Sequence, residues 1–210
     1  LGDLEGRAPV LRSGARPGDL VVHAGTLGRS AAGLALLSAG PQVMAGLERA
    51  EDMPQVRDCL AAFRAPSPAL AAGPALATGG ATSMMDVSDG LLRDAGRIAR
   101  ASGVVIDLDD PDDLPDMSFL EPVAVLVADD AGPAARALAR RWLLTGGEDH
   151  GMLATFPADA AERLPEGVRV IGRVLDLEAP QSRALGHRPG VLLGEEPAQE
   201  SAGWDHFAGG

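Results

Sequence analysis

The chain has 210 residues, a length that corresponds to one large domain or two small ones. Apolar residues make up 46% of it, which is enough to form a core and excludes wholesale disorder. The net charge of −12, from 30 acidic and 18 basic residues, argues against a nucleic-acid partner. No run of about 18 uncharged apolar residues occurs, so we expect no membrane-spanning helix and no membrane partner.

The basic residues are all arginine, and the chain contains no lysine. A Walker-type phosphate site requires a lysine, so this class of nucleotide site is excluded. Cys59 has no second cysteine with which to form an internal disulfide, and we interpret it as a small buried apolar residue. Aromatic residues are few, so any stacking role falls to Trp142, Trp204 or the four phenylalanines.

The first part of the chain predicts a connection followed by a strand and a helix. Residues 1–18 are polar and rich in glycine and proline, which is typical of a linker. The apolar run at 19–24 predicts a short strand, and the small residues of 25–33 lead into a helix that ends near Ser38.

Prolines divide the next stretch into helical pieces. Residues 41–63 predict a mostly helical segment with a break near Pro54. Residues 64–68 are expected to be extended, because a proline disfavours helical geometry in the residue before it. A short alanine-rich helix is predicted at 69–77.

The centre of the chain predicts a buried strand followed by an amphipathic helix. Residues 82–87 are largely apolar, as expected of a buried strand. In the helix predicted at 89–102, apolar residues share one face, while Arg93, Asp94 and Arg97 fall on the opposite, polar face.

Strands and helices alternate irregularly over the remainder of the chain. This pattern predicts a mixed α/β or α+β domain over residues 19–210. The further predicted strands are 104–108, 152–156, 168–174 and 191–193, and the further predicted helices are 131–141 and 158–164.

An acidic segment at 107–116 contains six aspartates. An EF-hand calcium loop is not indicated, because the segment lacks the glycine of its turn and the glutamate that closes it. We interpret the segment as a solvated charged loop.

Asp86-Val87-Ser88-Asp89-Gly90 lies where the buried strand ends and the amphipathic helix begins. Polar side chains at such a junction project into the crevice beyond the strand ends, and exposed helix amides there attract phosphate. Two carboxylates beside a phosphate are suitable ligands for Mg²⁺. The alternative is that Asp89 or Ser88 only caps the helix and that Asp86 is an ordinary turn residue.

Two glycine-rich segments are weaker signals. The first is Thr145-Gly146-Gly147-Glu148-Asp149-His150, in which two glycines permit close approach of a ligand and two adjacent acidic residues follow. The alternative is a tight turn whose acidic side chains are solvated. Residues 25–33 (GTLGRSAAG) suggest a phosphate-binding loop but match neither established glycine motif, and small residues here also allow close helix packing.

In this order, LRSGARPGD, GTLGRSAAGL, DVSDGLLRD, TGGEDH and GWDHF resemble the thiamine-monophosphate kinase family, within the aminoimidazole-ribonucleotide synthetase superfamily. The resemblance runs from about Leu11 to the C-terminus, and DVSDGL and GGED are its most specific motifs. It implies the C-terminal domain of that fold, with a mixed sheet flanked by helices. It also implies ATP-dependent phosphorylation of thiamine monophosphate to thiamine diphosphate, with Mg²⁺, in the cytoplasm.

The resemblance further implies roles for individual residues. Arg12 and Ser88 would contact ATP, with Arg12 on its phosphates, and Asp86 and Asp89 would each ligate Mg²⁺. Glu148 would contact the thiamine phosphate. Trp204 would flank this substrate.

The acidic motifs of the family's N-terminal domain are absent from this sequence. The resemblance therefore implies that residues 1–18 lead from a missing ATP-binding domain, that the full-length enzyme is a homodimer through that domain, and that this chain alone is inactive. Two alternatives remain open: another ATP-dependent synthetase of the superfamily, and a non-catalytic binding module.

Overall fold

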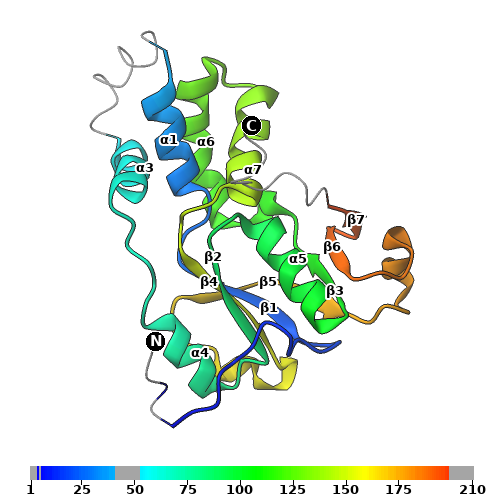
Figure 1. Ribbon diagram of the computed structural model, residues 1–210. Helices are drawn as coiled ribbons and strands as arrows, with labels where there is room; N and C mark the ends of the chain where they lie inside the picture. Colours follow the sequence, from blue (N-terminus) through cyan, green and yellow to red (C-terminus); the bar gives the residue numbers. More distant parts are fainter. Residues whose placement is uncertain (1–3, 5, 41–52, 199–210) are drawn as a thin grey trace, which may run out of the picture.

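The computed structural model describes residues 4, 6–40 and 53–198. In this part of the chain, seven strands form one mixed sheet with the order β2-β4-β1-β5-β3-β6-β7 (Figure 1). Neighbouring strands are antiparallel except β3 and β6, which are parallel. This confirms the predicted fold class. The strands are β1 Leu20–Ala24, β2 Ser83–Val87, β3 Val105–Leu108, β4 Gly151–Phe156, β5 Val168–Leu175, β6 Gly190–Leu193 and β7 Glu196–Pro197.

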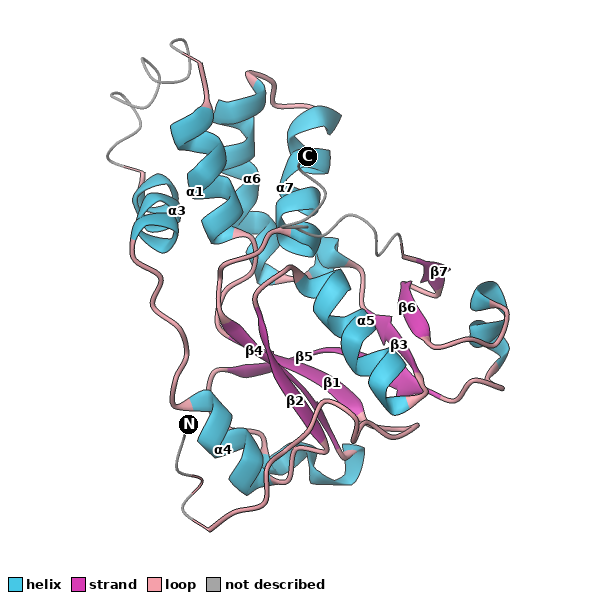
Figure 2. Cartoon of the chain, viewed as in Figure 1, coloured by secondary structure: helices cyan, strands magenta, loops and turns pink. Residues whose placement is uncertain are grey.

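The described helices lie on both faces of the sheet and beyond one end of it (Figure 2). Helix α5 packs along one face, α4 covers part of the other, and α1, α3, α6 and α7 form a group beyond the end of the sheet. None of them is both long and apolar enough to cross a membrane. The α-helices are α1 Arg29–Ser38, α3 Pro54–Arg64, α4 Ala72–Gly79, α5 Leu91–Ser102, α6 Pro115–Ala128 and α7 Pro133–Thr145. The 3₁₀ helices are η1 Pro111–Asp113, η2 Ala158–Arg163 and η3 Pro180–Leu185.

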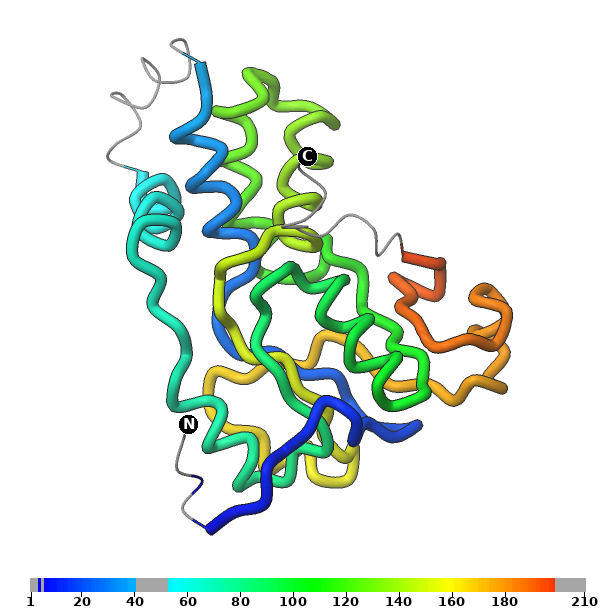
Figure 3. Tube along the Cα trace, in the orientation of Figure 1, coloured from blue at the N-terminus to red at the C-terminus, as the bar shows by residue number. Residues whose placement is uncertain are grey.

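Alternation along β1 separates two cores. Val21 belongs to the larger core, which also contains Ile98 of α5, whereas Val22 belongs to a smaller core with Leu76 of α4. Successive side chains of a strand point to opposite faces, so the sheet can bury apolar residues on both sides. Figure 3 follows the chain from β1 into α1, back through α3 to α4, and then into β2. Of the helical stretch predicted at 41–63, residues 41–52 lie outside the described part.

Helix α6 is an element to which the sequence pattern assigns nothing. Pro115 occupies its first turn, where a missing amide hydrogen is tolerated, but Pro122 lies in its interior. Leu120, Val123 and Ala124 are fully buried against neighbouring helices. Burial of this apolar face stabilises the helix despite the proline.

The segment predicted as a linker is attached to the domain where it is described. The Arg7 guanidinium donates hydrogen bonds to the Pro74 carbonyl and the Thr78 hydroxyl of α4. Farther on, Ala15 is buried, and its amide donates to the hydroxyl of Ser102 at the end of α5. The role of residues 1–18 as an interdomain connection stays a prediction.

Candidate active site

The three glycine- and acid-containing motifs meet at one edge of the sheet. Strand β4 lies between β1 and β2 and is antiparallel to both, so Ala24 and Asp86 each pair with Met152. The C-terminal ends of β1 and β2 therefore flank the beginning of β4, on the side of the sheet that leads to the helical group (Figure 1). Motifs far apart in the sequence thus become neighbours.

The DVSDG and GGED segments are joined through their backbones. The Glu148 amide donates to the Ser88 carbonyl at 2.9 Å, and the His150 amide donates to the Val87 carbonyl at 3.2 Å. A side chain at Gly147 would collide with the carbonyl oxygen of Ser88, so this close approach requires glycine. Ser88 and Glu148 are accordingly brought together, as the proposed roles require.

The two predicted metal ligands have different surroundings. Asp86 is exposed at the end of β2, and its carboxylate has no hydrogen-bond partner among the described residues. Asp89 forms a hydrogen-bonded ion pair with Arg97 of α5. Partial burial raises the pKa of Asp89, but the hydrogen bond and charge of Arg97 outweigh this effect and lower the pKa overall. Asp89 is therefore held in its charged form.

Asp94 differs from its predicted placement. It is fully buried instead of lying on a solvent face, and its carboxylate accepts hydrogen bonds from the amides of Ser88 and Asp89, each at 3.0 Å. It also pairs with Arg97 at 2.6 Å. The alternative in which Asp89 or Ser88 caps α5 is wrong, because the N-cap is Gly90, without a side-chain hydrogen bond. The Asp94 side chain reaches back to the turn that precedes α5. Helical periodicity alone does not predict this contact.

The GTLGRSAAG segment forms a helix N-terminus whose amides are already occupied. The Asp149 carboxylate accepts hydrogen bonds from the amides of Gly28 at 2.7 Å and Ser30 at 3.1 Å. Burial raises the pKa of Asp149 to about 6, although these amide hydrogen bonds oppose the increase. A carboxylate of the chain itself thus takes the position that the phosphate hypothesis assigned to a ligand.

Close packing explains the glycines of this segment, as the alternative interpretation expected. A Cβ on Gly28 would lie 2.7 Å from the backbone carbon of Trp142, and one on Gly33 would collide with the Cys59 carbonyl. Arg29, in the first turn of α1, stacks on the Phe119 ring, 3.8 Å from its centroid.

The acidic segment is solvated only in part: Asp109, Asp110 and Asp113 are exposed, as the sequence interpretation expected, whereas the two end residues are not. Asp107 and Asp116 are both buried, and two arginines of β5 neutralise them. Arg173 lies across from Asp107 in the sheet and binds its carboxylate at 2.9 Å, while Arg169 binds Asp116 at 2.6 Å. The pairing depends on the neighbouring strand, which local sequence does not reveal.

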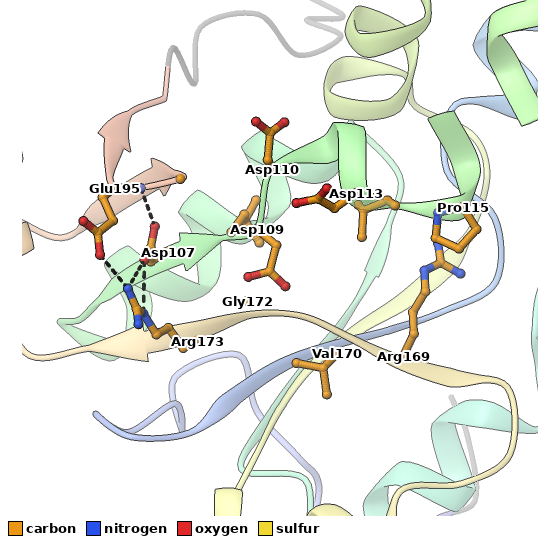
Figure 4. Close-up of a pocket in the computed structure, with 13 residues that line it drawn as sticks. Asp107, Asp109, Asp110, Asp113, Pro115, Arg169, Val170, Gly172, Arg173 and Glu195 are labelled. Carbon is orange, nitrogen blue, oxygen red and sulfur yellow. Dashed lines mark hydrogen bonds and ion pairs between the residues drawn. The ribbon is translucent and has the colours of Figure 1, made fainter. Parts of the chain in front are cut away.

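Asp107, Arg169 and Arg173 line a cavity of about 630 Å³. Figure 4 shows Arg173 directed toward Asp107 and Glu195, with Asp109, Asp110 and Asp113 on the opposite wall. None of the predicted site residues that the structure describes lines this cavity. We therefore place the candidate site at the sheet edge described above.

A second cavity, of about 570 Å³, adjoins that sheet edge. Its walls come from α1, α3, α7 and the GGED turn, and most of its surface is apolar. Leu34 and Phe63 are exposed within it, and Glu148 lies at its border. The cavity thus combines apolar walls with a carboxylate at one side, as small-molecule sites do. The residues that line it include Ser30, Leu34, Phe63, Arg141, Trp142 and Glu148.

Two predicted site residues are not brought into the cluster by the described structure. The backbone carbonyl of Arg12 accepts a hydrogen bond from Ser102 at the C-terminal end of α5. Asp89 lies just before the other end of this helix of 12 residues, which is about 18 Å long. Trp204 lies outside the described residues. The roles of Arg12 and Trp204 stay predictions.

The donor set fits Mg²⁺ in part. Asp86 and Asp89 supply hard carboxylate oxygens of the kind that Mg²⁺ prefers. Within the described ranges, no group of three or more histidine, cysteine or acidic side chains could hold a metal ion. Each carboxylate thus suits an ion of its own, for which phosphate oxygens and water would supply the other ligands.

The strand ends, the acidic turns and the adjoining cavity define an α/β domain with its candidate site at one sheet edge. Residues 16–180 match the family described as AIR synthase related protein, C-terminal domain, and the chain belongs to this family. Its relatives there include thiamine-monophosphate kinases, which confirms the resemblance found in the motifs.

Two of these relatives cover nearly all of the chain. The thiamine-monophosphate kinase of Mycobacterium tuberculosis (strain ATCC 25618 / H37Rv) is 41% identical over 207 residues, which are 99% of this chain and 52% of the relative. That of Corynebacterium glutamicum is 37% identical over 210 residues, 99% of this chain and 54% of the relative. The chain thus spans about half the length of these relatives.

Solved structures agree with this placement. The thiamine-monophosphate kinase of Stenotrophomonas maltophilia K279a matches with a TM-score of 0.66 and 28% identity, over 92% of this chain and 55% of that one. A structure of AaThiL complexed with AMPPCP and TMP matches with a TM-score of 0.66 and 30% identity, over 94% of this chain and 54% of that one.

Proposed function

We propose that this chain is the C-terminal part of a thiamine-monophosphate kinase, which transfers the γ-phosphate of ATP to thiamine monophosphate and yields thiamine diphosphate. The observation that carries the proposal is the hydrogen bond between the backbones of Ser88 and Glu148, beside an apolar cavity. The contact supports the proposal because we assign Ser88 to ATP and Glu148 to thiamine monophosphate, and the two substrates must meet. The names of the relatives and the AMPPCP and TMP in the AaThiL complex support the same reaction.

We assign the thiamine moiety to the cavity of about 570 Å³. Leu34 and Phe63 offer apolar contact to flat rings, and the Glu148 carboxylate offers a negative charge to the cationic thiazolium. The volume lies in the range of roughly 300–1,000 Å³ that is usual for small-molecule sites.

The described part of the chain ends at Ala198, beside a cavity that adjoins this one. Ala198 lines a neighbouring cavity, which shares Arg141 and Thr145 with the one that contains Glu148. The six residues from Ala198 to Trp204 span at most about 20 Å when extended. This reach supports the proposal that Trp204 flanks the substrate.

We assign the binding of the ATP phosphates to the DVSDG turn, residues 86–90. We assign Mg²⁺ to Asp86 and Asp89, and Mg²⁺ in such sites neutralises the charge of the nucleotide phosphates. Arg97 and Asp94 fix the orientation of the Asp89 side chain and of the turn. Phosphoryl transfer requires positioning and charge neutralisation above all, so the absence of a general base among these residues is compatible with it.

The remaining parts of the proposal concern the longer protein. The family is that of a C-terminal domain, and the relatives are about twice as long as the chain, which supports a preceding domain that completes the ATP site. We propose that this preceding domain forms the dimer interface and that the enzyme works in the cytoplasm. The 210-residue chain alone is then inactive.

The test is an assay of the longer protein with ATP, Mg²⁺ and thiamine monophosphate, in which thiamine diphosphate is measured. We expect turnover, with a raised KM for thiamine monophosphate in Glu148→Gln and an unchanged KM for ATP. Turnover of a different substrate of the superfamily would favour the synthetase alternative. Binding of thiamine monophosphate without turnover would favour a binding module, and turnover by the 210-residue chain alone would contradict the domain assignment.

A further inference from the structure

Asp149 is a buried carboxylate between two residues with unusual backbone angles. Glu148 has a φ of 68° and His150 a φ of 52°, both in the left-handed region that side chains disfavour. Asp149 itself is 7% exposed. Such strained residues persist where the surrounding contacts fix them, and they concentrate at functional sites.

The carboxylate of Asp149 supplies contacts that fix the turn. Helix α1 begins after Gly28, which provides no side-chain cap, and its first turn contains no acidic residue. Asp149 instead accepts hydrogen bonds from the amides of Gly28 and Ser30, and its negative charge lies at the positive end of the helix. A residue distant in sequence thus performs the work of an N-cap.

Asp149 also connects the two walls of the cavity. Ser30, whose amide it binds, lines the cavity from α1, while Glu148, its neighbour in the chain, lines it from the turn. On the other side, the Glu148 amide is bound to the Ser88 carbonyl. The position of Glu148 is therefore set by one contact to the turn that follows β2 and by one carboxylate that reaches α1.

We propose that Asp149 is a positioning residue that holds Glu148 at the cavity wall and thereby sets the affinity for thiamine monophosphate. This inference rests on the proposed function, since it assigns Asp149 a task in the same site. Asp149 acts through Glu148 and through the first turn of α1, without touching the substrate.

The experiment uses the longer protein and the variants Asp149→Asn, Glu148→Gln and the double variant. The Asn side chain keeps one acceptor oxygen but turns an amide group toward the other backbone donor, so the turn loses one of its two hydrogen bonds to α1 and the negative charge while the volume stays the same. We expect Asp149→Asn to raise the KM for thiamine monophosphate roughly tenfold and to leave the KM for ATP unchanged. In the Glu148→Gln background, the same change should have little further effect, because the two residues act as a unit.

Asp116→Asn is the matched control. Asp116 is also a buried carboxylate, and it accepts a hydrogen bond at 3.0 Å from the amide of Leu27, in the loop that precedes α1. It has no hydrogen bond to the Glu148 turn in the described structure. Asp149→Asn should accelerate hydrogen–deuterium exchange in the peptide that contains Glu148 and His150, whereas Asp116→Asn should not, at a similar loss of stability. If Asp149→Asn does not fold, Asp149→Glu keeps the charge and displaces the carboxylate, with the same expected pattern.

The outcomes separate this inference from the proposed function. A wild-type protein without turnover contradicts the function, while faster exchange in Asp149→Asn alone still supports the positioning role. Wild-type turnover combined with unchanged exchange and unchanged KM in Asp149→Asn overturns the inference. Fully additive effects in the double variant, or failure of both Asp149 variants to fold, would show that Asp149 is only structural.

Discussion

The amide of Glu148 donates a hydrogen bond to the carbonyl oxygen of Ser88, with 2.9 Å between nitrogen and oxygen. The side chains assigned to the two substrates therefore originate from adjacent backbones at one end of the sheet. Substitutions at this edge should change kinetic constants more than stability. Substitutions in the tightly packed interior should do the reverse.

In the longer protein, Asp86→Asn should lower kcat strongly at limiting Mg²⁺, and a higher Mg²⁺ concentration should partly restore it. The substitution keeps the shape of the side chain but removes a charged oxygen ligand. Because Asp86 is exposed, the melting temperature should stay near that of the wild type. Asp159→Asn, at an exposed aspartate beyond the opposite end of β4, is the control and should leave the Mg²⁺ dependence unchanged. Unaltered turnover of Asp86→Asn at limiting Mg²⁺ would show that Asp86 is a turn residue.

Trp204→Ala should raise the KM for thiamine monophosphate several-fold and leave the KM for ATP nearly unchanged. A cationic thiazolium over an indole face gains about 0.5–2 kcal/mol, which the substitution removes. The melting temperature should change little. A sharp loss of thermal stability, together with a parallel change of both KM values, would instead identify Trp204 as a residue that only pins the tail to the domain.

His23→Leu should reduce the loss of the free energy of unfolding that accompanies a fall in pH below 6.5. His23 is fully buried, and both of its ring nitrogens lack a hydrogen-bond partner among the described residues. Burial, and secondarily the charge of Arg169, lower the pKa of His23 from 6.5 to about 3. Its contribution to stability is therefore complete above pH 6.5 and is lost as the pH falls toward 3, because only the unfolded chain binds the proton in this window.

Urea denaturation between pH 4 and 7.5 measures this effect in the 210-residue chain and in His23→Leu. The slope due to one proton is about 1.4 kcal/mol per pH unit, and it should be present in the difference between the two curves. The pKa of Asp149 is raised from 3.8 to about 6, so the folded chain binds this proton before the unfolded chain does. The free energy of unfolding therefore increases as the pH falls from 6 toward 3.8, opposite to the effect of His23. That contribution is common to both proteins and cancels. Parallel curves would contradict the prediction.

Gly28→Ala should destabilise the chain more than Gly103→Ala. Both glycines have positive φ, 77° and 70°, so both alanine variants incur a similar backbone strain, about 1–2 kcal/mol. A Cβ on Gly28 would also lie 2.7 Å from the backbone of Trp142, whereas the space around Gly103 is open. The added overpacking should cost about 1–3 kcal/mol in the free energy of unfolding. Equal losses in urea denaturation would mean that α1 shifts away from α7 without cost.

The sequence predicts the elements whose pattern is local. Strands β1 and β2 and helix α5 agree with their predicted positions to within two residues, because apolar alternation and helical periodicity are properties of a short stretch. Helix α6 escapes such a pattern, since Pro122 suggests a break that tertiary packing overrides.

The site follows the same division. Ser88 and Glu148 are proposed from the motifs of the resemblance, and the structure shows that their backbones are neighbours. Asp94 and Asp149 are missed as buried anchors, because a carboxylate is expected in solvent unless its partners are known. Their partners are backbone amides of reversed or distant segments, which only the folded chain supplies.

The packing of α1 on α3 also leaves the domain with a protected thiol. Cys59 is the one cysteine of the sequence, and burial raises the pKa of its thiol to about 12. Its carbonyl touches Gly33, so the thiol becomes reactive only when these two helices separate. A cysteine introduced on the exposed surface would therefore react with a maleimide dye long before Cys59 does. The slow reaction of a second dye molecule with Cys59 would report how often α1 and α3 separate.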